Sequence, residues 1–270
     1  MFKTALIIDI KPDAGGGIGM CLSKLNYFSK IQKENFLVIS TYKSTSLLLK
    51  KKYKIDNIFY NKSGSVNKII NFYSKKIRFF SSSFEKFLEN KKVNKIFFLS
   101  PSYLNLLIQR ISYIYTIWDL SHLEKKLDKL PEHSKEVKNI RDKCYQQASN
   151  NASYIIIGTK ENKTKFIKRY NCKNKKLKIL KFKPFICYKN KVKRSAIDHL
   201  YKNQKNFFLY PAQYWSHKNH EFLIDFFEKY KDDKLINNFK LICTGFDKGN
   251  FYNLKKKIKS KKIEKKNNFI

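Results

Sequence analysis

Short apolar segments of strand type recur along the 270-residue chain, and stretches with helical periodicity separate most of them. This alternation is typical of a parallel sheet with helices on both of its faces. The sequence therefore predicts an α/β fold. The expected strands are residues 4–10, 36–40, 58–60, 95–100, 113–118, 154–158, 178–182, 207–210 and 239–244.

One predicted strand–loop–helix unit carries a candidate anion site. Residues 207–220 read Phe-Phe-Leu-Tyr-Pro-Ala-Gln-Tyr-Trp-Ser-His-Lys-Asn-His. Pro211 ends the strand because it cannot donate a ladder hydrogen bond, and helical spacing of apolar residues begins after His220. Lys218 is then expected at or just before a helix N-terminus, where free N–H groups and the helix dipole favour a phosphate. The carboxyl end of a parallel strand is also where open α/β sheets bind ligands.

A glycine-rich loop, Lys-Pro-Asp-Ala-Gly-Gly-Gly-Ile-Gly, follows the first predicted strand at residues 11–19, and a helix is expected over 20–31. Consecutive glycines allow positive φ and a close approach to a ligand. At the mouth of a helix they would expose N–H groups to a phosphate or a sugar hydroxyl. The spacing is not that of the dinucleotide-binding fingerprint, and a plain turn is the alternative interpretation.

The formal charge of +37 is extreme, and only five of the 58 basic residues are arginines. The lysines are spread along the whole chain beside many Asn, Ile, Phe and Tyr residues, which share AT-rich codons, so genome composition explains the charge as well as selection does. A nucleic-acid-binding protein concentrates its basic residues on one element, so we expect no nucleic-acid partner. An anionic membrane surface is the more plausible partner for scattered lysines.

The five cysteines are odd in number and widely spaced, which argues against a disulfide framework or a zinc site and favours a reducing compartment. No apolar run approaches the roughly 18 residues of a membrane span. The N-terminal apolar run is too short for a signal peptide. The sequence therefore predicts a cytoplasmic protein.

The segment Tyr-Pro-Ala-Gln-Tyr-Trp-Ser-His-Lys-Asn-His resembles the one that opens the second domain of bacterial group 1 glycosyltransferases (family 4, retaining). The resemblance implies a GT-B fold, in which two Rossmann-like domains face a cleft and Lys218 contacts the donor diphosphate. Gln213 stands where many members have an arginine, and it can hydrogen-bond a phosphate without neutralising it. The other positions that the resemblance assigns to donor or cleft contacts are Gly16, Gly17, Gly19, Asn219 and Gly245.

A second resemblance lies in Thr-Ile-Trp-Asp-Leu-Ser-His at residues 116–122, since members of the family end a strand in a His-Asp or Trp-Asp pair beside the active cleft. Asp119 could orient an acceptor hydroxyl, or equally cap the next turn. His122 is a candidate for contact with the acceptor or sugar, with a solvated loop histidine as the alternative. Trp118 cannot replace the catalytic histidine of other members, and Arg141 lies either on a helix surface or across the cleft.

Two further stretches of the sequence each allow a structural and a functional interpretation. Thr159 and Glu161 open a predicted helix whose mouth faces the cleft in the family, and we favour structural capping over ligand contact. The basic and aromatic stretch 66–88 packs on the sheet in the favoured interpretation and lies in the lipid headgroup region in the other.

The resemblance divides the chain into a first domain at 1–183, a linker at 184–205 and the start of a second, donor-binding domain at 206–270. The paired glutamates of the family's second domain are missing, because the carboxylates after Gly245 are Asp247 and Glu264. We therefore expect a C-terminally truncated second domain.

The activity implied is that of a retaining hexosyltransferase that uses a nucleotide sugar, without a cofactor or an obligatory metal, and acts on a glycan or lipid-linked acceptor. The enzyme would take part in the synthesis of O-antigen, capsule or exopolysaccharide. If it is a peripheral membrane protein, it would lie on the inner face of the membrane. The alternative is an inactive remnant or subunit that needs a completing C-terminal chain or binds only membrane or glycan.

Overall fold

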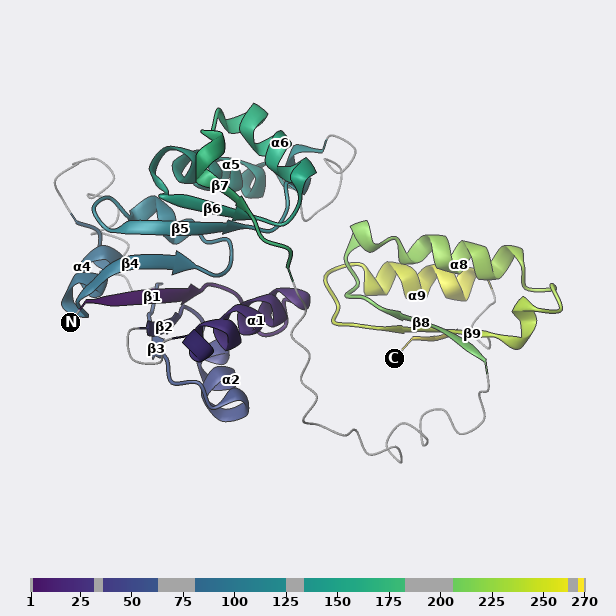
Figure 1. The fold of residues 1–270 in the computed structure, drawn as a ribbon. Helices are drawn as coiled ribbons and strands as arrows, with labels where there is room; N and C mark the ends of the chain where they lie inside the picture. Colours follow the sequence, from purple (N-terminus) through teal and green to yellow (C-terminus); the bar gives the residue numbers. More distant parts are fainter. Residues whose placement is uncertain are drawn as a thin grey trace. The chain divides into compact units, whose positions relative to one another are not determined.

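The computed structural model describes residues 2–31, 36–62, 81–124, 134–182, 206–261 and 267–269. The chain divides into two compact units, and the described residues form seven strands in the first unit and three in the second (Figure 1). The predicted linker at 184–205 and most of the stretch 66–88 lie outside the described residues, so both remain predictions.

The first unit is built on a fully parallel sheet with the strand order β3-β2-β1-β4-β5-β6-β7. The order changes direction between β1 and β4, which is the topological switch point of a Rossmann-like sheet. The strands are β1 (Lys3–Ile8), β2 (Phe36–Ser40), β3 (Ile58–Phe59), β4 (Val93–Phe98), β5 (Ser112–Ile117), β6 (Tyr154–Ile157) and β7 (Leu177–Ile179). These strands confirm the predicted parallel α/β architecture.

Successive residues of a strand point to opposite faces of the sheet, and both faces are apolar here. Helices cover both of these faces. Ala5 and Ile7 pack with residues of α4 (Ser83–Asn90), α5 (Lys135–Asn151) and α6 (Lys160–Tyr170). Leu6 and Ile8 pack with α1 (Gly16–Ile31) and α2 (Lys43–Tyr53) on the opposite face (Figure 1). Short 3-10 turns, η1 (Tyr103–Leu107), η2 (Ser121–Leu123) and η5 (Asn174–Lys176), complete the described connections.

In its described part, the second unit is a parallel sheet with the order β10-β9-β8, covered on one face by two helices. Its elements are β8 (Phe207–Pro211), η6 (Ser216–Lys218), α8 (His220–Lys229), η7 (Ile236–Asn238), β9 (Lys240–Thr244), α9 (Phe251–Ser260) and β10 (Asn267–Phe269). The buried core includes Ile224 and Phe227 of α8, Leu254 of α9 and Leu241 of β9. On β8, Phe207 and Leu209 remain 41% and 52% exposed.

The start of α1 differs from the prediction. The helix begins at Gly16, so Gly16, Gly17 and Gly19 belong to its first turn and not to a loop. Positive φ in this segment is found at Gly15, with a φ of 67°. Among the described residues, no helix is both long and apolar enough to cross a membrane.

Candidate functional site

A polar cluster centred on Asp9 lies where the carboxyl ends of β1, β2, β3 and β4 meet. Asp9 Oδ1 accepts hydrogen bonds from Thr41 Oγ1 and from Lys62 Nζ, the latter at 2.6 Å. Asp9 Oδ2 accepts one from Ser102 Oγ at 2.7 Å, and the backbone N–H of Asp9 donates to Ser100 Oγ at 3.0 Å. The side chain of Asp9 is only 4% exposed. This cluster occupies the switch point, where sheets of this kind bind their ligands.

Lys62 is held between two aromatic rings. Its ammonium lies 4.0 Å from the ring centroid of Tyr42 and 4.9 Å from that of Tyr103. Burial would lower the pKa of Lys62, but the charge and hydrogen bond of Asp9 raise it above its ordinary value. Tyr103 is 40% exposed, so the cluster presents an aromatic ring to solvent, with the largely enclosed Lys62 ammonium behind it. None of these residues was predicted as a site residue, although Thr41 directly follows a predicted strand, at the edge where parallel sheets bind their ligands.

At Gly17, the first turn of α1 packs against the loop that follows β5. A Cβ atom on Gly17 would lie 2.4 Å from Ile10 Cδ1 and 2.6 Å from Trp118 Cη2. The glycine is thus needed for close packing, whereas a Cβ on Gly16 would meet no atom within 4 Å. Trp118 Nε1 is buried and has no hydrogen-bond partner within the described part of the chain.

Asp119 is fixed in a turn and an ion pair. Its Oδ1 atom accepts from Ser121 N at 3.0 Å, from Ser121 Oγ at 2.6 Å and from Arg141 Nη2 at 2.6 Å. Burial opposes ionisation, but the Arg141 charge and the Ser121 hydrogen bonds lower the pKa of Asp119 to about 2. Asp119 therefore caps the turn, and its ionised, hydrogen-bonded carboxylate is a weak general base. Arg141 faces Asp119 and Tyr145.

His122 is buried and neutral. It is 4% exposed, so the interpretation as a solvated loop histidine is wrong. Its Nε2 lies 3.0 Å from Tyr170 Oη, and Tyr170 donates to Asp142 Oδ1 at 2.7 Å. Because Tyr170 donates its hydroxyl proton to Asp142, its oxygen can only accept a hydrogen bond from His122. His122 therefore carries its proton on Nε2 and donates it to Tyr170. Burial, followed by the charge of Arg141, lowers the pKa of His122 to about 4.

Thr159 and Glu161 have structural contacts at the start of α6. Thr159 Oγ1 accepts from Asn162 N at 3.1 Å, which confirms the predicted N-cap. Glu161 is exposed and pairs with Lys165 one turn later, at 2.7 Å. Both residues therefore stabilise the helix itself.

Lys218 lies where the sequence predicted it, just before a helix N-terminus. It ends η6, and Asn219, with a φ of 51°, separates it from α8. Its backbone is held from both sides, since Lys218 N donates to Trp215 O at 3.0 Å and Tyr210 Oη donates to Lys218 O at 2.8 Å. The exposed side chain thus extends from a fixed backbone beside the N–H groups of α8.

Gly245 holds the loop after β9 against the loop after β8. A Cβ atom on Gly245 would lie 2.3 Å from Ala212 O and 2.8 Å from Gln213 Cα. From its sequence context we expected Gly245 to contact the donor, but the close approach that requires a glycine here is to the backbone of Ala212. The side chain of Gln213 accepts a hydrogen bond from Trp215 Nε1 at 3.0 Å.

His220, the first residue of α8, was not singled out from the sequence. It is fully buried, and its ring centroid lies 5.0 Å from that of Tyr210 and 4.8 Å from that of Tyr214. Burial and the nearby charge of Lys218 both lower the pKa of His220. By strict hydrogen-bond geometry neither ring nitrogen is paired within the ranges that the structure describes, although the backbone of Ala212 lies close enough to raise the pKa in the opposite direction. His220 therefore packs the start of α8 against Tyr210, Tyr214 and the backbone that precedes Lys218.

No group of His, Cys, Asp or Glu in the described ranges is arranged to hold a metal ion. No family model and no curated protein matches the chain.

Several solved structures share the fold, which is GT-B with two Rossmann-like units, as predicted from the sequence. Anabaena HepE in complex with UDP-glucose matches with a TM-score of 0.69 and 16% identity, over 100% of this chain and 69% of that one. WaaG, a glycosyltransferase involved in lipopolysaccharide biosynthesis, matches with a TM-score of 0.61 and 11% identity, over 99% and 69%. Methanocaldococcus jannaschii UDP-GlcNAc 2-epimerase, in complex with UDP-GlcNAc and UDP, matches with a TM-score of 0.56 and 15% identity, over 100% and 73%.

Proposed function

We propose that the protein is a retaining glycosyltransferase that transfers a sugar from a nucleotide-sugar donor to a glycan or lipid-linked acceptor in bacterial surface polysaccharide synthesis. The observation that carries the proposal is Lys218, held on a fixed backbone just before the N-terminus of α8. Structures of the same fold support it, because HepE was solved with UDP-glucose and WaaG is a glycosyltransferase of lipopolysaccharide biosynthesis.

The proposed chemistry stabilises a departing diphosphate. When the bond between the sugar and the diphosphate breaks, negative charge accumulates on the phosphate oxygens, and groups already placed around them lower the barrier. Lys218 would supply a cation, and the first N–H groups of α8 would supply oriented donors. Together they remove the need for a metal ion in this proposal. Retention of configuration would follow from departure and attack on the same face of the sugar.

The first unit would bind the acceptor. The exposed ring of Tyr103 offers a surface on which a sugar can pack, and Lys62 is a fixed cation beside it. Asp119 and His122 would hold the loop that borders this site, because the first is ionised and hydrogen-bonded and the second is buried and neutral. Scattered lysines would add attraction to an anionic membrane surface.

Donor binding tests the proposal directly. Binding of UDP, and of a panel of UDP-, dTDP-, GDP- and ADP-sugars, is measured by calorimetry, and transfer or hydrolysis is followed with labelled sugar. We expect one nucleotide series to bind, and Lys218→Met to weaken it by about tenfold or more, as for loss of a charge-assisted contact. Lys229→Met, at the exposed end of α8, is the matched control. Wild-type protein that binds no nucleotide, or a Lys218→Met variant that binds as tightly as wild type, contradicts the proposal.

A second candidate is a subunit that requires a completing chain. The exposed apolar side chains of Phe207 and Leu209 on β8 favour it, since such a row of residues is usually covered by another element. Donor binding that appears only after a partner chain is added would support this candidate over the first.

A further inference from the structure

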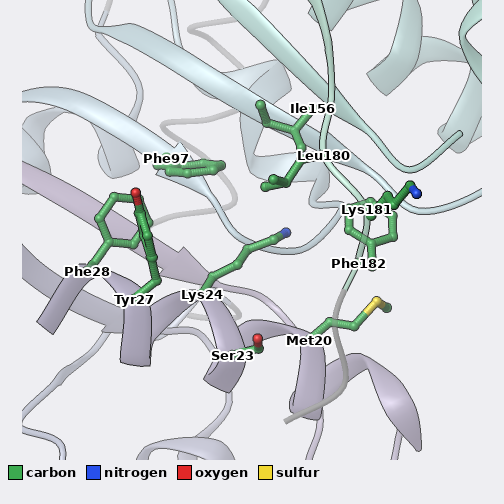
Figure 2. A pocket seen from close by; sticks show the side chains of 10 residues that line it. All are labelled: Met20, Ser23, Lys24, Tyr27, Phe28, Phe97, Ile156, Leu180, Lys181 and Phe182. Carbon is green, nitrogen blue, oxygen red and sulfur yellow. The ribbon is translucent and has the colours of Figure 1, made fainter. Parts of the chain in front are cut away.

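A pocket of about 400 Å³ opens in the first unit between α1 and the sheet (Figure 2). Tyr27 and Phe28 of α1 form one wall. The opposite side is formed by Phe97 of β4, Ile156 of β6, and Leu180 after β7. The volume is in the range of small-molecule sites. The pocket belongs to neither the polar cluster around Asp9 nor the Lys218 loop.

The pocket exists because α1 covers only part of this face of the sheet. The buried core on this side joins α1 and α2 to β1, β2 and β4, whereas Ile156 of β6 is only partly buried. Leu180 is 48% exposed and Tyr27 is 63% exposed. The walls are therefore apolar surface that is open to an apolar occupant.

Lys24 places a cation inside this apolar pocket. Its Nζ donates to Leu99 O at 2.9 Å and to Thr116 Oγ1 at 3.3 Å, and it lies 5.1 Å from the ring centroid of Phe182. These two bonds use two of the three N–H donors of an ammonium group. Burial lowers the pKa of Lys24 to about 8, so the Lys24 amine is protonated in most molecules at neutral pH.

No carboxylate in the described part of the chain forms an ion pair with Lys24. Its neighbour Cys21 cannot replace one, because burial raises the pKa of that thiol to about 12 and keeps it neutral. A buried charge without a counter-ion is costly, and a bound anion would remove that cost.

We infer that this pocket binds an anionic amphiphile, in which an apolar chain lies along the aromatic and aliphatic walls and a carboxylate or phosphate accepts the remaining N–H of Lys24. The cation specifies the charge of the ligand, and the walls specify its apolar body. Two sources share this chemistry, a membrane lipid and a soluble fatty acid or alkyl phosphate.

Calorimetry with dodecyl phosphate, dodecanol and inorganic phosphate, all below micellar concentrations, tests the inference on the full chain. We expect one dodecyl phosphate per chain, bound at least about tenfold more tightly than either of the other two compounds. Lys24→Met should reduce the affinity by about tenfold, while Lys30→Met, which removes an equal charge from the exposed end of α1, should leave it unchanged. The Lys30 control separates a specific site from general attraction to a basic protein.

A second variant fills the pocket and keeps Lys24. Ile156→Trp should abolish dodecyl phosphate binding, and Leu235→Trp, at an exposed position in the second unit, should not. Thermal melting establishes that each variant is folded. Equal binding of dodecanol and dodecyl phosphate, or binding unaffected by Lys24→Met, overturns the inference. A dimer that Ile156→Trp dissociates would also overturn it, by showing that the pocket is a contact between two copies.

Vesicles distinguish the two sources of ligand. If Lys24→Met weakens binding to phosphatidylglycerol vesicles as well as to dodecyl phosphate, the occupant is a membrane lipid. If only dodecyl phosphate binding is weakened, the occupant is a soluble amphiphile. Neither outcome depends on donor binding at Lys218, so the inference and the proposed function fail separately.

Discussion

Gly17 lies directly against the indole of Trp118, so the first turn of α1 and the loop after β5 form one packed contact. A Cβ atom at position 17 would lie 2.6 Å from Trp118 Cη2, well inside van der Waals contact. The two segments that resemble the glycine loop and the Trp-Asp loop of glycosyltransferases are therefore joined by packing in the first unit.

Gly17→Ala tests this contact. The added methyl group must displace both Ile10 and Trp118, and we expect a loss of about 1–3 kcal/mol in the free energy of unfolding. Gly16→Ala is the matched control, because the methyl group there meets open space. The control should change stability by less than about 1 kcal/mol. Urea unfolding followed by circular dichroism measures both, and equal stabilities for the two variants would contradict the packing role.

His122 should make the first unit sensitive to mild acid. Its pKa of about 4 in the folded chain is below the ordinary value of 6.5. The unfolded chain therefore takes up a proton at higher pH, so stability is lost as the pH falls from about 6.5 to about 4. We expect the unfolding free energy of the wild-type chain to fall by on the order of 2 kcal/mol across this interval. The His122→Gln variant, which keeps an N–H donor, should not show this fall. His217→Gln in the second unit is the control, and an unchanged profile in His122→Gln would refute the assignment.

The Asp119–Arg141 ion pair should affect the stability of the first unit at a lower pH than His122 does. The pKa of Asp119 is lowered from 3.8 to about 2, so the stability it provides is present above pH 4 and lost as the pH falls through about 2. The Asp119 side chain is 51% exposed even though neighbouring residues surround it, and solvent screening limits the pair to about 1 kcal/mol. A double-mutant cycle of Asp119→Asn and Arg141→Met should give this coupling at pH 7 and less at pH 2. Coupling that does not change with pH would rule out a charge interaction.

Gly245→Ala should destabilise the second unit. The new methyl group would meet Ala212 O at 2.3 Å, and backbone cannot move aside as a flexible side chain can. We expect a loss of about 2–3 kcal/mol, and weaker donor binding because the Lys218 loop moves with Ala212. Ala212→Gly in the same chain should give no rescue, since the clash is with a carbonyl oxygen. Full rescue by this second change would disprove the mechanism.

The sheet could be predicted from sequence because its strands are short apolar runs bounded by polar or turn residues, as at residues 36–40. The start of α1 could not, because glycines disfavour helix and only the contact with Ile10 and Trp118 makes them suitable there. Strand β10 lies in a lysine- and asparagine-rich segment with no apolar alternation, and pairing with β9 alone defines it.

The candidate site divides in the same way. Lys218 was predictable because a strand, a loop and a helix follow one another locally. Asp9 and Lys62 are 53 residues apart, and no local pattern links them. Lys24 reads as an exposed helical lysine, and only the packing of α1 on β4 and β5 shows that its amine is enclosed.

The chain has two tryptophans, Trp118 against Gly17 in the first unit and Trp215 hydrogen-bonded to Gln213 in the second. Each unit thus carries its own intrinsic fluorophore, and the Trp215 indole is tied to the same loop as Lys218. Replacing Trp118 with phenylalanine would leave Trp215 as the single tryptophan, so tryptophan-selective excitation would report on that loop without any attached dye.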